Sequence, residues 1–467
     1  MRGDSRRPTK GVRMRSDGSP STAEPPFRVA RALKLGSFHI GSSLSDLLTS
    51  AVWNRVLIAD LGVAAWPVAL LSALRYLLTP LVLWAGHRSD TRPILGSYRV
   101  AYIWLGRLLM LLSLPLLPPS LVLLGADAAS PLGWGMALAS FLLYGVGTLI
   151  SGAPFLALVH DSAPYARRGQ AVGIVQIMLV VSFAFIPIVY ARLMPTYTAE
   201  DFARLVWIGM AGAALFWVWS VWGEERPRDA ATDQMVKPPA LSLRATLSTL
   251  WADVSARRYA IFLATSAFFA FMQDAMLEPF GGDVFGLAAG ETTRFNAYWG
   301  TGVLLAMLAT LALTRRRRPD QQVATTAWGL IGLGLALLAL GVASWLRLER
   351  LLVPVLFLFG IGFGVFTVGG VSLLMAVNVE GQAGSYLALW SAIQLVARGA
   401  GIAMGGIVRD VGMALSGEAH LAYALLFAIE ALGVLASVWL LARVGVDRFA
   451  ARRSIASTQP APAMIAE

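Results

Sequence analysis

The sequence contains no cysteine and little charge. With no cysteine among its 467 residues, disulfides, thiolate metal sites and cysteine nucleophiles are excluded. Only 14% of the residues are charged, whereas about 25% is usual in a soluble globular chain. Because 57% of the residues are hydrophobic, the composition predicts an integral membrane protein.

Short enzymatic motifs are also missing. The chain has no phosphate-binding GxxxxGK[ST] loop, no HExxH and no serine flanked as in a nucleophile elbow. We therefore expect no catalytic residues, no metal centre, no tightly bound cofactor and no ATP-driven transport. The net charge of +11 lies in short basic clusters between apolar runs, as membrane topology requires, so we expect no nucleic-acid partner.

Long apolar runs dominate what is present. A membrane-spanning helix needs about 20 apolar residues. Twelve runs meet this need, near 35–58, 66–86, 98–118, 132–158, 169–191, 204–222, 259–280, 295–314, 324–345, 351–377, 384–408 and 420–442. The longest polar interruption divides them six and six. The sequence therefore predicts an all-α membrane protein with twelve transmembrane helices in two pseudo-symmetric six-helix halves, the architecture of the major facilitator superfamily.

The polar segments define the expected domain boundaries. We predict a disordered tail at 1–34, an N-terminal half at 35–222, a linker at 223–258, a C-terminal half at 259–444 and a second tail at 445–467. The first tail is basic and lacks the apolar core of a signal peptide. Most of the 38 lysines and arginines fall in the tails and in alternate loops, which predicts that both termini are cytoplasmic.

Several ionisable residues lie inside the apolar runs. Such residues are costly in lipid and usually face a bundle interior, a cavity or a partner charge. The candidates for a cavity between the halves are Asp46, Arg75, Arg107, Gln273, Asp274, Glu278 and Arg398. Two interpretations stay open: the arginines and acids form a structural network, or one arginine faces the cavity and binds an acidic or carbonyl group of a ligand.

The segment MQDAMLEPFGGDVFGL (272–287) places two acids four residues apart. On one helix Asp274 and Glu278 would share a face, and Pro279 with the following glycines would end that helix at the outer surface. This predicts that Glu278 lies near the interface while Asp274 is buried more deeply. Arg55 lies near the outer end of its run, so we expect its side chain to extend to the interface.

A charged loop, GHRSDTRPILGSYR (86–99), follows the second run. Gly86, Asp90, Arg92 and Arg99 loosely follow the glycine, aspartate and basic pattern of facilitator proteins at this place. The glycine permits close helix approach, and the aspartate can accept bonds from a helix N-terminus or pair with arginine. An ordinary charged loop would look the same.

Four segments carry a family resemblance: WNRVLIADLGV (53–63), GHRSDTRPILGSYRVAYIW (86–104), the acid-bearing segment at 272–287, and ALWSAIQLVARGAGIAMGGIVRD (388–410). Together they resemble the PucC/LhaA family, the bacteriochlorophyll-delivery and light-harvesting assembly branch of the facilitator superfamily. The resemblance spans roughly 27–445 and both halves. It implies that the protein hands bacteriochlorophyll, as cargo, to light-harvesting antenna polypeptides in the cytoplasmic or intracytoplasmic photosynthetic membrane.

The implied pigment points to further candidate residues. Its central magnesium takes neutral imidazole as an axial ligand, so His39 and His160 are candidate ligands, although histidines near loops are often only polar interfacial residues. Trp53, Trp299 and Trp390 are candidate surfaces for a flat macrocycle.

Two other functions stay open. A proton-coupled transporter of a small solute would use Asp46, Asp274 and Glu278 as proton carriers, and a pigment-free scaffold would bind antenna subunits only. A transporter fold alone does not decide between these functions.

Overall fold

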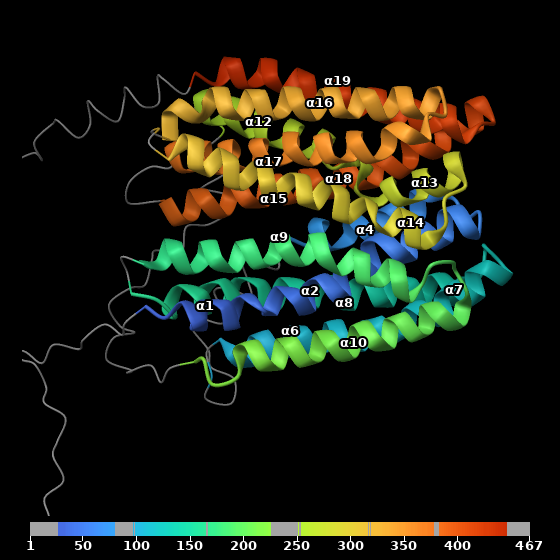
Figure 1. The fold of residues 1–467 in the computed structure, drawn as a ribbon, viewed down its shortest axis with the longest axis horizontal. Coiled ribbons are helices and arrows are strands. Elements are labelled where there is room, and N and C mark those ends of the chain that lie inside the picture. The colour runs from blue at the N-terminus through green and yellow to red at the C-terminus, as the bar shows by residue number, and fades with distance from the viewer. Residues whose placement is uncertain are drawn as a thin grey trace, which may run out of the picture.

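In the part of the chain that the structure describes, every secondary-structure element longer than one residue is a helix (Figure 1). The computed structural model describes residues 27–79, 97, 99–164, 167–225, 251, 254–315, 317, 319–377 and 383–445. The predicted all-α class is therefore confirmed. Most of the predicted linker and both tails lie outside these ranges, so the predicted domain boundaries stay predictions.

The first group of helices comprises the elements before residue 225. In chain order they are α1 (Val29–Gly36), α2 (Phe38–Leu47), η1 (Leu48–Val52), α3 (Trp53–Arg55), η2 (Val56–Asp60), α4 (Ala65–Leu77), α6 (Val100–Ser113), η3 (Leu114–Leu116), α7 (Leu117–Ala126), α8 (Pro131–Asp161), α9 (Arg168–Leu193) and α10 (Ala199–Val221). The turns η1 and η2 are π-helical, so α1 to η2 form one helical segment with local widening.

The second group comprises the elements after residue 253. They are α12 (Val254–Ala270), the 3-10 turn η5 (Met272–Ala275), α13 (Leu277–Phe285), α14 (Ala289–Thr293), α15 (Phe295–Thr314), η6 (Pro319–Gln322), α16 (Val323–Trp345), η7 (Glu349–Leu351), α17 (Leu352–Val377), α18 (Ala383–Ser416) and α19 (Ala419–Val444).

The predicted count of twelve spans is not confirmed. Within the described ranges nine helices are long and apolar enough to cross a membrane, or ten if the bent pair 254–275 and 277–285 is one span. The segment containing α1 to η2 carries Asp46, Arg55 and Asp60 as well as several serines, and α4 has only 13 residues before the described part ends. These two segments therefore fall outside a definition based on length and hydropathy.

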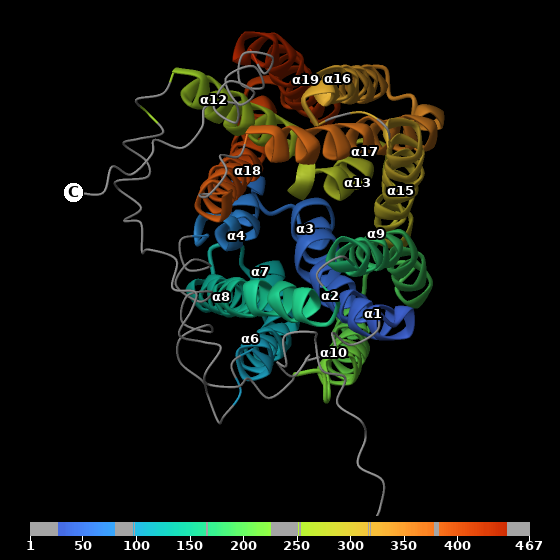
Figure 2. The same cartoon turned by 90° about the vertical axis from the view of Figure 1, so that its left-hand side faces the viewer.

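The two groups of helices lie against each other along their length. Figure 2 shows the first group, α1 to α10, on one side and the second group, α12 to α19, on the other. The helices α18 and α4 pack together, and so do α15 and α9. These two helix pairs flank the space in which the candidate site lies.

Close contact of α18 with a neighbour in each group depends on its small residues. A Cβ atom at Gly406 would lie 2.7 Å from the carbonyl oxygen of Ala65, at the start of α4. A Cβ atom at Gly401 would collide with the carbonyl oxygen of Phe268, in α12. Because glycine has no Cβ, α18 can approach the backbones of both neighbours.

One end of the bundle carries polar bonds between the two groups. The carboxylate of Asp410, in α18, accepts from the backbone N–H groups of Ala65 at 3.1 Å and Trp66 at 2.8 Å. These are free donors at the start of α4, a position that favours an anion. Nearby, the N–H of Gly290 donates to the carbonyl of Pro195 at 2.9 Å. These bonds fix the second group to the first at this end.

Glu224 holds α1 at the opposite end. Its carboxylate lies 2.5 Å from Arg31 Nε and 2.8 Å from Lys34 Nζ. Burial opposes the negative charge of Glu224, but the hydrogen bonds from Lys34 and Arg31 outweigh it and hold the carboxyl pKa below its ordinary value of about 4.5. The acid therefore links the end of α10 to the start of the first helical segment.

We expect Glu224→Gln to lower the free energy of unfolding by about 1 kcal/mol at neutral pH. Because the folded pKa lies below the ordinary value, this stabilisation is fully present above about 4.5 and is lost as the pH falls through the folded value. Thermal unfolding in detergent at a series of pH values measures both effects. The exposed Glu349→Gln is the matched control, and equal pH dependence of the two variants would contradict the assignment.

Candidate functional site

A cavity of about 640 Å³ lies between the two groups of helices. Five of the seven residues predicted to face it do line it, namely Asp46, Arg75, Asp274, Glu278 and Arg398. Apolar and aromatic side chains form much of the remaining wall, among them Leu156, Phe183, Phe271, Trp299 and Phe363. The cavity is therefore apolar over much of its surface, with charges gathered near the contact between the groups.

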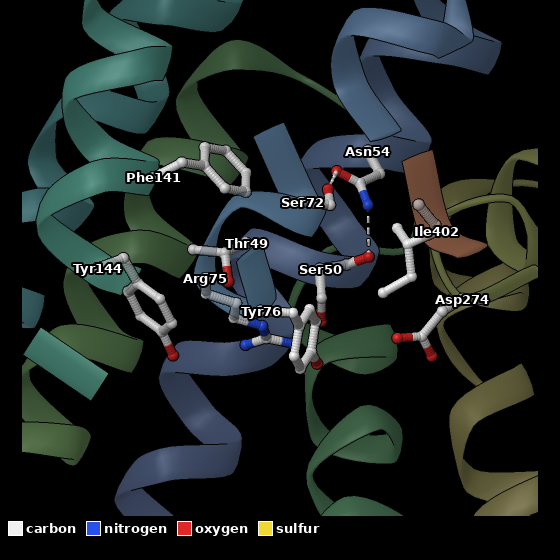
Figure 3. Close-up of a pocket in the computed structure, with 11 residues that line it drawn as sticks. Thr49, Ser50, Asn54, Ser72, Arg75, Tyr76, Phe141, Tyr144, Asp274 and Ile402 are labelled. Atoms are coloured by element: carbon white, nitrogen blue, oxygen red, sulfur yellow. Dashed lines mark hydrogen bonds between the residues drawn. The ribbon is translucent and has the colours of Figure 1, made fainter. Parts of the chain in front are cut away.

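The first group contributes one ion pair to the cavity. Arg75 Nη1, in α4, lies 2.7 Å from Asp46 Oδ1, in α2, and both side chains are about four-fifths buried, at 17% and 23% exposure. The hydroxyl of Tyr144, in α8, also donates to Asp46 Oδ1. Arg75 and Tyr144 line a smaller hollow of about 10 Å³ at this place, and Figure 3 shows these two side chains among the residues around it.

The second group contributes a matching pair. Arg398 Nη2, in α18, lies 2.8 Å from Asp274 Oδ2, in the turn η5, with exposures of 26% and 24%. The ring of Tyr76 lies near both guanidinium groups, with centroid distances of 4.8 Å from Arg75 Cζ and 4.4 Å from Arg398 Cζ. Cations near an aromatic face are stabilised by the ring quadrupole, so Tyr76 connects the two pairs.

The chain breaks its helix at the acid-bearing segment, which the sequence analysis did not predict. The helix α12 ends at Ala270, η5 follows, and α13 starts at Leu277 at an angle of 48°. Pro279 lies in the first turn of α13, where its missing N–H has no cost, and Gly286, with φ 69°, ends that helix. The prediction that Pro279 ends a single continuous helix is wrong.

The predicted burial of the two acids is also reversed. Glu278 is 3% exposed and its Oε1 accepts from Asn296 Nδ2, in α15. The side chain of Asp274 is 24% exposed and faces the cavity. Because α13 turns away from the line of α12, Glu278 lies inside the bundle, and the two acids do not share a continuous helix face.

Arg55 does not extend to the membrane interface as expected. It is 3% exposed, its Nη2 donates to the carbonyl of Leu287 at 2.7 Å, and its Nη1 lies 3.0 Å from Asp60. Gly282, in α13, leaves the room that the guanidinium group fills. The interface prediction fails because these polar partners from both groups lie beside the helix that carries Arg55.

Two predicted cavity residues lie elsewhere. Arg107 is buried in the first group between Phe38 and Trp217, with its Cζ 4.3 and 4.7 Å from the ring centroids, and its Nη1 lies 3.1 Å from the sulfur of Met110. It makes no ion pair within the described residues. Gln273 is 4% exposed and lies behind the cavity wall, where its backbone N–H donates to Glu430 Oε1 at 3.3 Å.

Neither candidate histidine lines the cavity. The ring of His39 packs edge-on against Phe155 at 5.5 Å, and its Nδ1 is buried with no hydrogen-bond partner among the described residues. His160 is exposed at the end of α8. Among the candidate tryptophans, Trp299 lines the cavity, whereas Trp53 and Trp390 are buried in the two groups.

The predicted charged loop lies mostly outside the described residues. Gly86, Asp90 and Arg92 belong to that outside part. Arg99 is described at the start of α6, where its Nη1 lies 2.9 Å from Asp161, at the end of α8. Its backbone N–H donates to Glu225 at 2.9 Å.

Several polar residues near the site were missed in the sequence. Nothing in the spacing of Tyr76, Tyr144 and Asn296 marks them as neighbours of buried charged groups. Glu430 carries the signal that identified Asp46, a lone charge inside an apolar run. It is 0% exposed and lies beside Gln273, so it belongs to the same buried polar region.

The ion pair between Asp274 and Arg398 provides a test of coupling. We expect the double variant Asp274→Asn/Arg398→Gln to lose less stability than the sum of the losses in the two single variants. The expected difference, which is the coupling energy, is roughly 1–2 kcal/mol, because either single change leaves a mostly buried charge without its partner. Thermal unfolding of the single and double variants measures the coupling. The exposed pair Arg347 and Glu418 is the control, with an expected coupling of about 1 kcal/mol or less; equal couplings would contradict the assignment.

Solved structures with the same fold are transporters. A POT family transporter in complex with 5-aminolevulinic acid superimposes with a TM-score of 0.66 at 12% identity, covering 90% of this chain and 96% of that one. A D-xylose-proton symporter superimposes with a TM-score of 0.62 at 13% identity, covering 87% and 96%. At such identity the likeness shows the fold alone, which is that of the major facilitator superfamily.

Sequence relatives are closer. A protein described as "Uncharacterized protein in puhA-bchM intergenic region", from Rhodobacter capsulatus, is 32% identical over 81% of this chain and 80% of its own length. "Protein PucC" from Rhodovulum sulfidophilum is 30% identical over 82% and 85%. "Bacteriochlorophyll synthase 44.5 kDa chain" from Rhodobacter capsulatus is 30% identical over 90% and 96%. A family profile described as "PUCC protein" matches residues 52–449, and the chain therefore belongs to the PUCC protein family of multi-pass membrane proteins.

Proposed function

We propose that this protein binds bacteriochlorophyll in the central cavity and delivers it to light-harvesting antenna polypeptides. The proposed place of action is the cytoplasmic or intracytoplasmic photosynthetic membrane, with both termini on the cytoplasmic side. Membership of the PUCC family supports a role in that membrane, and the name of one relative refers to bacteriochlorophyll.

The cavity is the observation that supports pigment binding most directly. At about 640 Å³ it falls within the range of about 300–1,000 Å³ that is usual for small-molecule sites. Trp299 and Phe363, whose ring centroids are 6.2 Å apart, lie on one wall. Aromatic rings pack well against a flat conjugated ring system, so part of the macrocycle is proposed to pack against this wall.

Polar donors would orient the pigment. Arg398 donates from Nη2 to Asp274, and its guanidinium-bearing side chain is 26% exposed and lines the cavity. A carbonyl group of the pigment is an acceptor that such a donor can bind. This arrangement supports the interpretation in which an arginine of the pair also faces a ligand. His39 and His160 lie outside the cavity, so magnesium ligation by them is not part of the proposal.

The absorption spectrum of the protein purified from a pigmented phototroph tests this function. Bacteriochlorophyll at a stoichiometric level would support delivery. Antenna polypeptides without additional pigment would overturn pigment binding and favour the scaffold. Pigment-free protein that moves protons together with a solute across vesicle membranes would favour a proton-coupled transporter. The observation that supports this alternative is the buried Glu278, which has no basic partner within hydrogen-bond distance in the part of the chain that the structure describes.

We expect Phe363→Ala to reduce the ratio of bound pigment to protein about threefold to tenfold, because it removes aromatic packing from the cavity wall. The ratio of pigment to protein absorbance after purification measures this effect. Phe185→Ala, which truncates a ring that is 61% exposed on the outside of α9, is the matched control. Equal losses in the two variants would place the pigment elsewhere.

A further inference from the structure

Glu430 is a buried acid that the cavity does not use. It lies in the middle of α19 and is 0% exposed. Its Oε1 accepts from the backbone N–H of Gln273 at 3.3 Å, and its Oε2 has no hydrogen-bond partner among the described residues. A carboxylate in such a place is costly unless it gains a proton or a cation.

No cation faces this acid from the described helices around it. The helix α16, which packs along α19, has no ionisable residue, and Asp274 is the charged group that acts on Glu430 electrostatically. The other ionisable groups on the described parts of the elements packed against α19 are Arg257, Arg258 and Tyr259 at the far end of α12, Glu278 and Asp283 in α13, and Arg398, Arg409 and Asp410 in α18. Of these, Arg398 pairs with Asp274, and Arg409 with Asp283 and Asp410.

Gln273 connects Glu430 to the region behind the cavity wall. Its side-chain Nε2 donates to the carbonyl of Ala270 at 3.2 Å, and its Oε1 is buried with no donor among the described residues. Both Gln273 Oε1 and Glu430 Oε2 are therefore acceptors that lack a donor. Protonation of Glu430 turns one of its carboxyl oxygens into a hydrogen-bond donor, which these two acceptors lack.

A small void lies next to Gln273. It has a volume of about 20 Å³ and is lined by Gln273, Asp274, Glu278, Asn296 and Trp299 among others. The lining is mainly apolar but includes polar side chains, and a void of this size is large enough for one water molecule. The residues Asp274, Glu278 and Trp299 line the central cavity as well, so the void lies between Gln273 and the cavity.

We propose that Glu430 is a proton-binding site that exchanges with the central cavity through Gln273 and this void. A proton adds to the carboxylate of Glu430 and gives a neutral carboxyl that donates within the group; its release leaves an anion beside the break between α12 and α13. Protonation therefore favours the bent arrangement seen here, and deprotonation disfavours it. The site does not depend on whether the cavity takes a pigment, so its test uses pigment-free protein.

Infrared spectroscopy of the purified full-length protein in lipid nanodiscs tests the proton. We expect Glu430→Gln, which keeps the shape of the neutral side chain, to remove a band of a protonated carboxyl at neutral pH. The control Glu349→Gln, at an exposed acid in η7, keeps the band. The variant Gln273→Leu, which removes the neighbouring acceptor, should shift the position of the band and leave the proton in place. Size-exclusion chromatography shows whether each variant is folded.

Fluorescence tests the link to the cavity. Trp299 donates to Asn296 at 3.3 Å on the wall that the void shares, and its signal is the difference between the protein with and without Trp299→Phe. The titration uses a Glu278→Gln background, because Glu278 is a second buried acid and accepts from Asn296 beside Trp299. In this background we expect alkaline titration to remove the carboxyl band and change the Trp299 signal together, and Glu430→Gln to lose both changes. A carboxyl band that is unchanged by Glu430→Gln in the folded protein of this background would overturn the proton site. If the Trp299 fluorescence does not change when the carboxyl band is lost, the proposed link between Glu430 and the cavity is overturned.

Discussion

An ion in the low-dielectric interior of this protein is strongly disfavoured unless an opposite charge, an aromatic ring or a change of protonation compensates it. Asp46 with Arg75, and Asp274 with Arg398, meet this requirement within their own groups of helices. The ring of Tyr76 then lies near both arginines. Beside the cavity, the two groups thus meet at an aromatic ring that lies between two completed ion pairs. Because each ion pair lies within one group, its charges stay paired whether or not the groups are in contact.

The break between α12 and α13 places the acids of the second group. Had the helix continued, Asp274 and Glu278 would lie on one face. The bend of 48° instead leaves Asp274 at the cavity and turns Glu278 toward Asn296. The same break frees backbone groups near Gln273, whose N–H donates to Glu430 rather than within a regular helix. A local change in backbone direction therefore creates a polar region behind an apolar wall.

The sequence predicts the helical class, most of the membrane-crossing segments and the membership of five residues in the cavity, since each depends on local hydropathy and on the cost of buried charge. It does not predict partners, because Arg75 could equally have faced any of the acids. It also misplaces Glu278 and Arg55. Glu278 is misplaced because the residues Met272 to Ala275 contain neither proline nor glycine, so nothing within this turn indicates the break. Arg55 is misplaced because Gly282, which makes room for its side chain, lies more than two hundred residues away in the sequence.

The bonds at one end of the bundle have a consequence for the membrane as an electrical insulator. Asp410 lies twelve residues beyond Arg398 on α18, about 18 Å along a helix, and holds the start of α4 by two N–H groups. Gly290 and Arg55 add bonds between the groups at the same end. A membrane that stores energy as an ion gradient loses it through any continuous aqueous pore. By joining the groups beyond the cavity, these bonds let the protein enclose a space large enough for a ligand without short-circuiting that gradient.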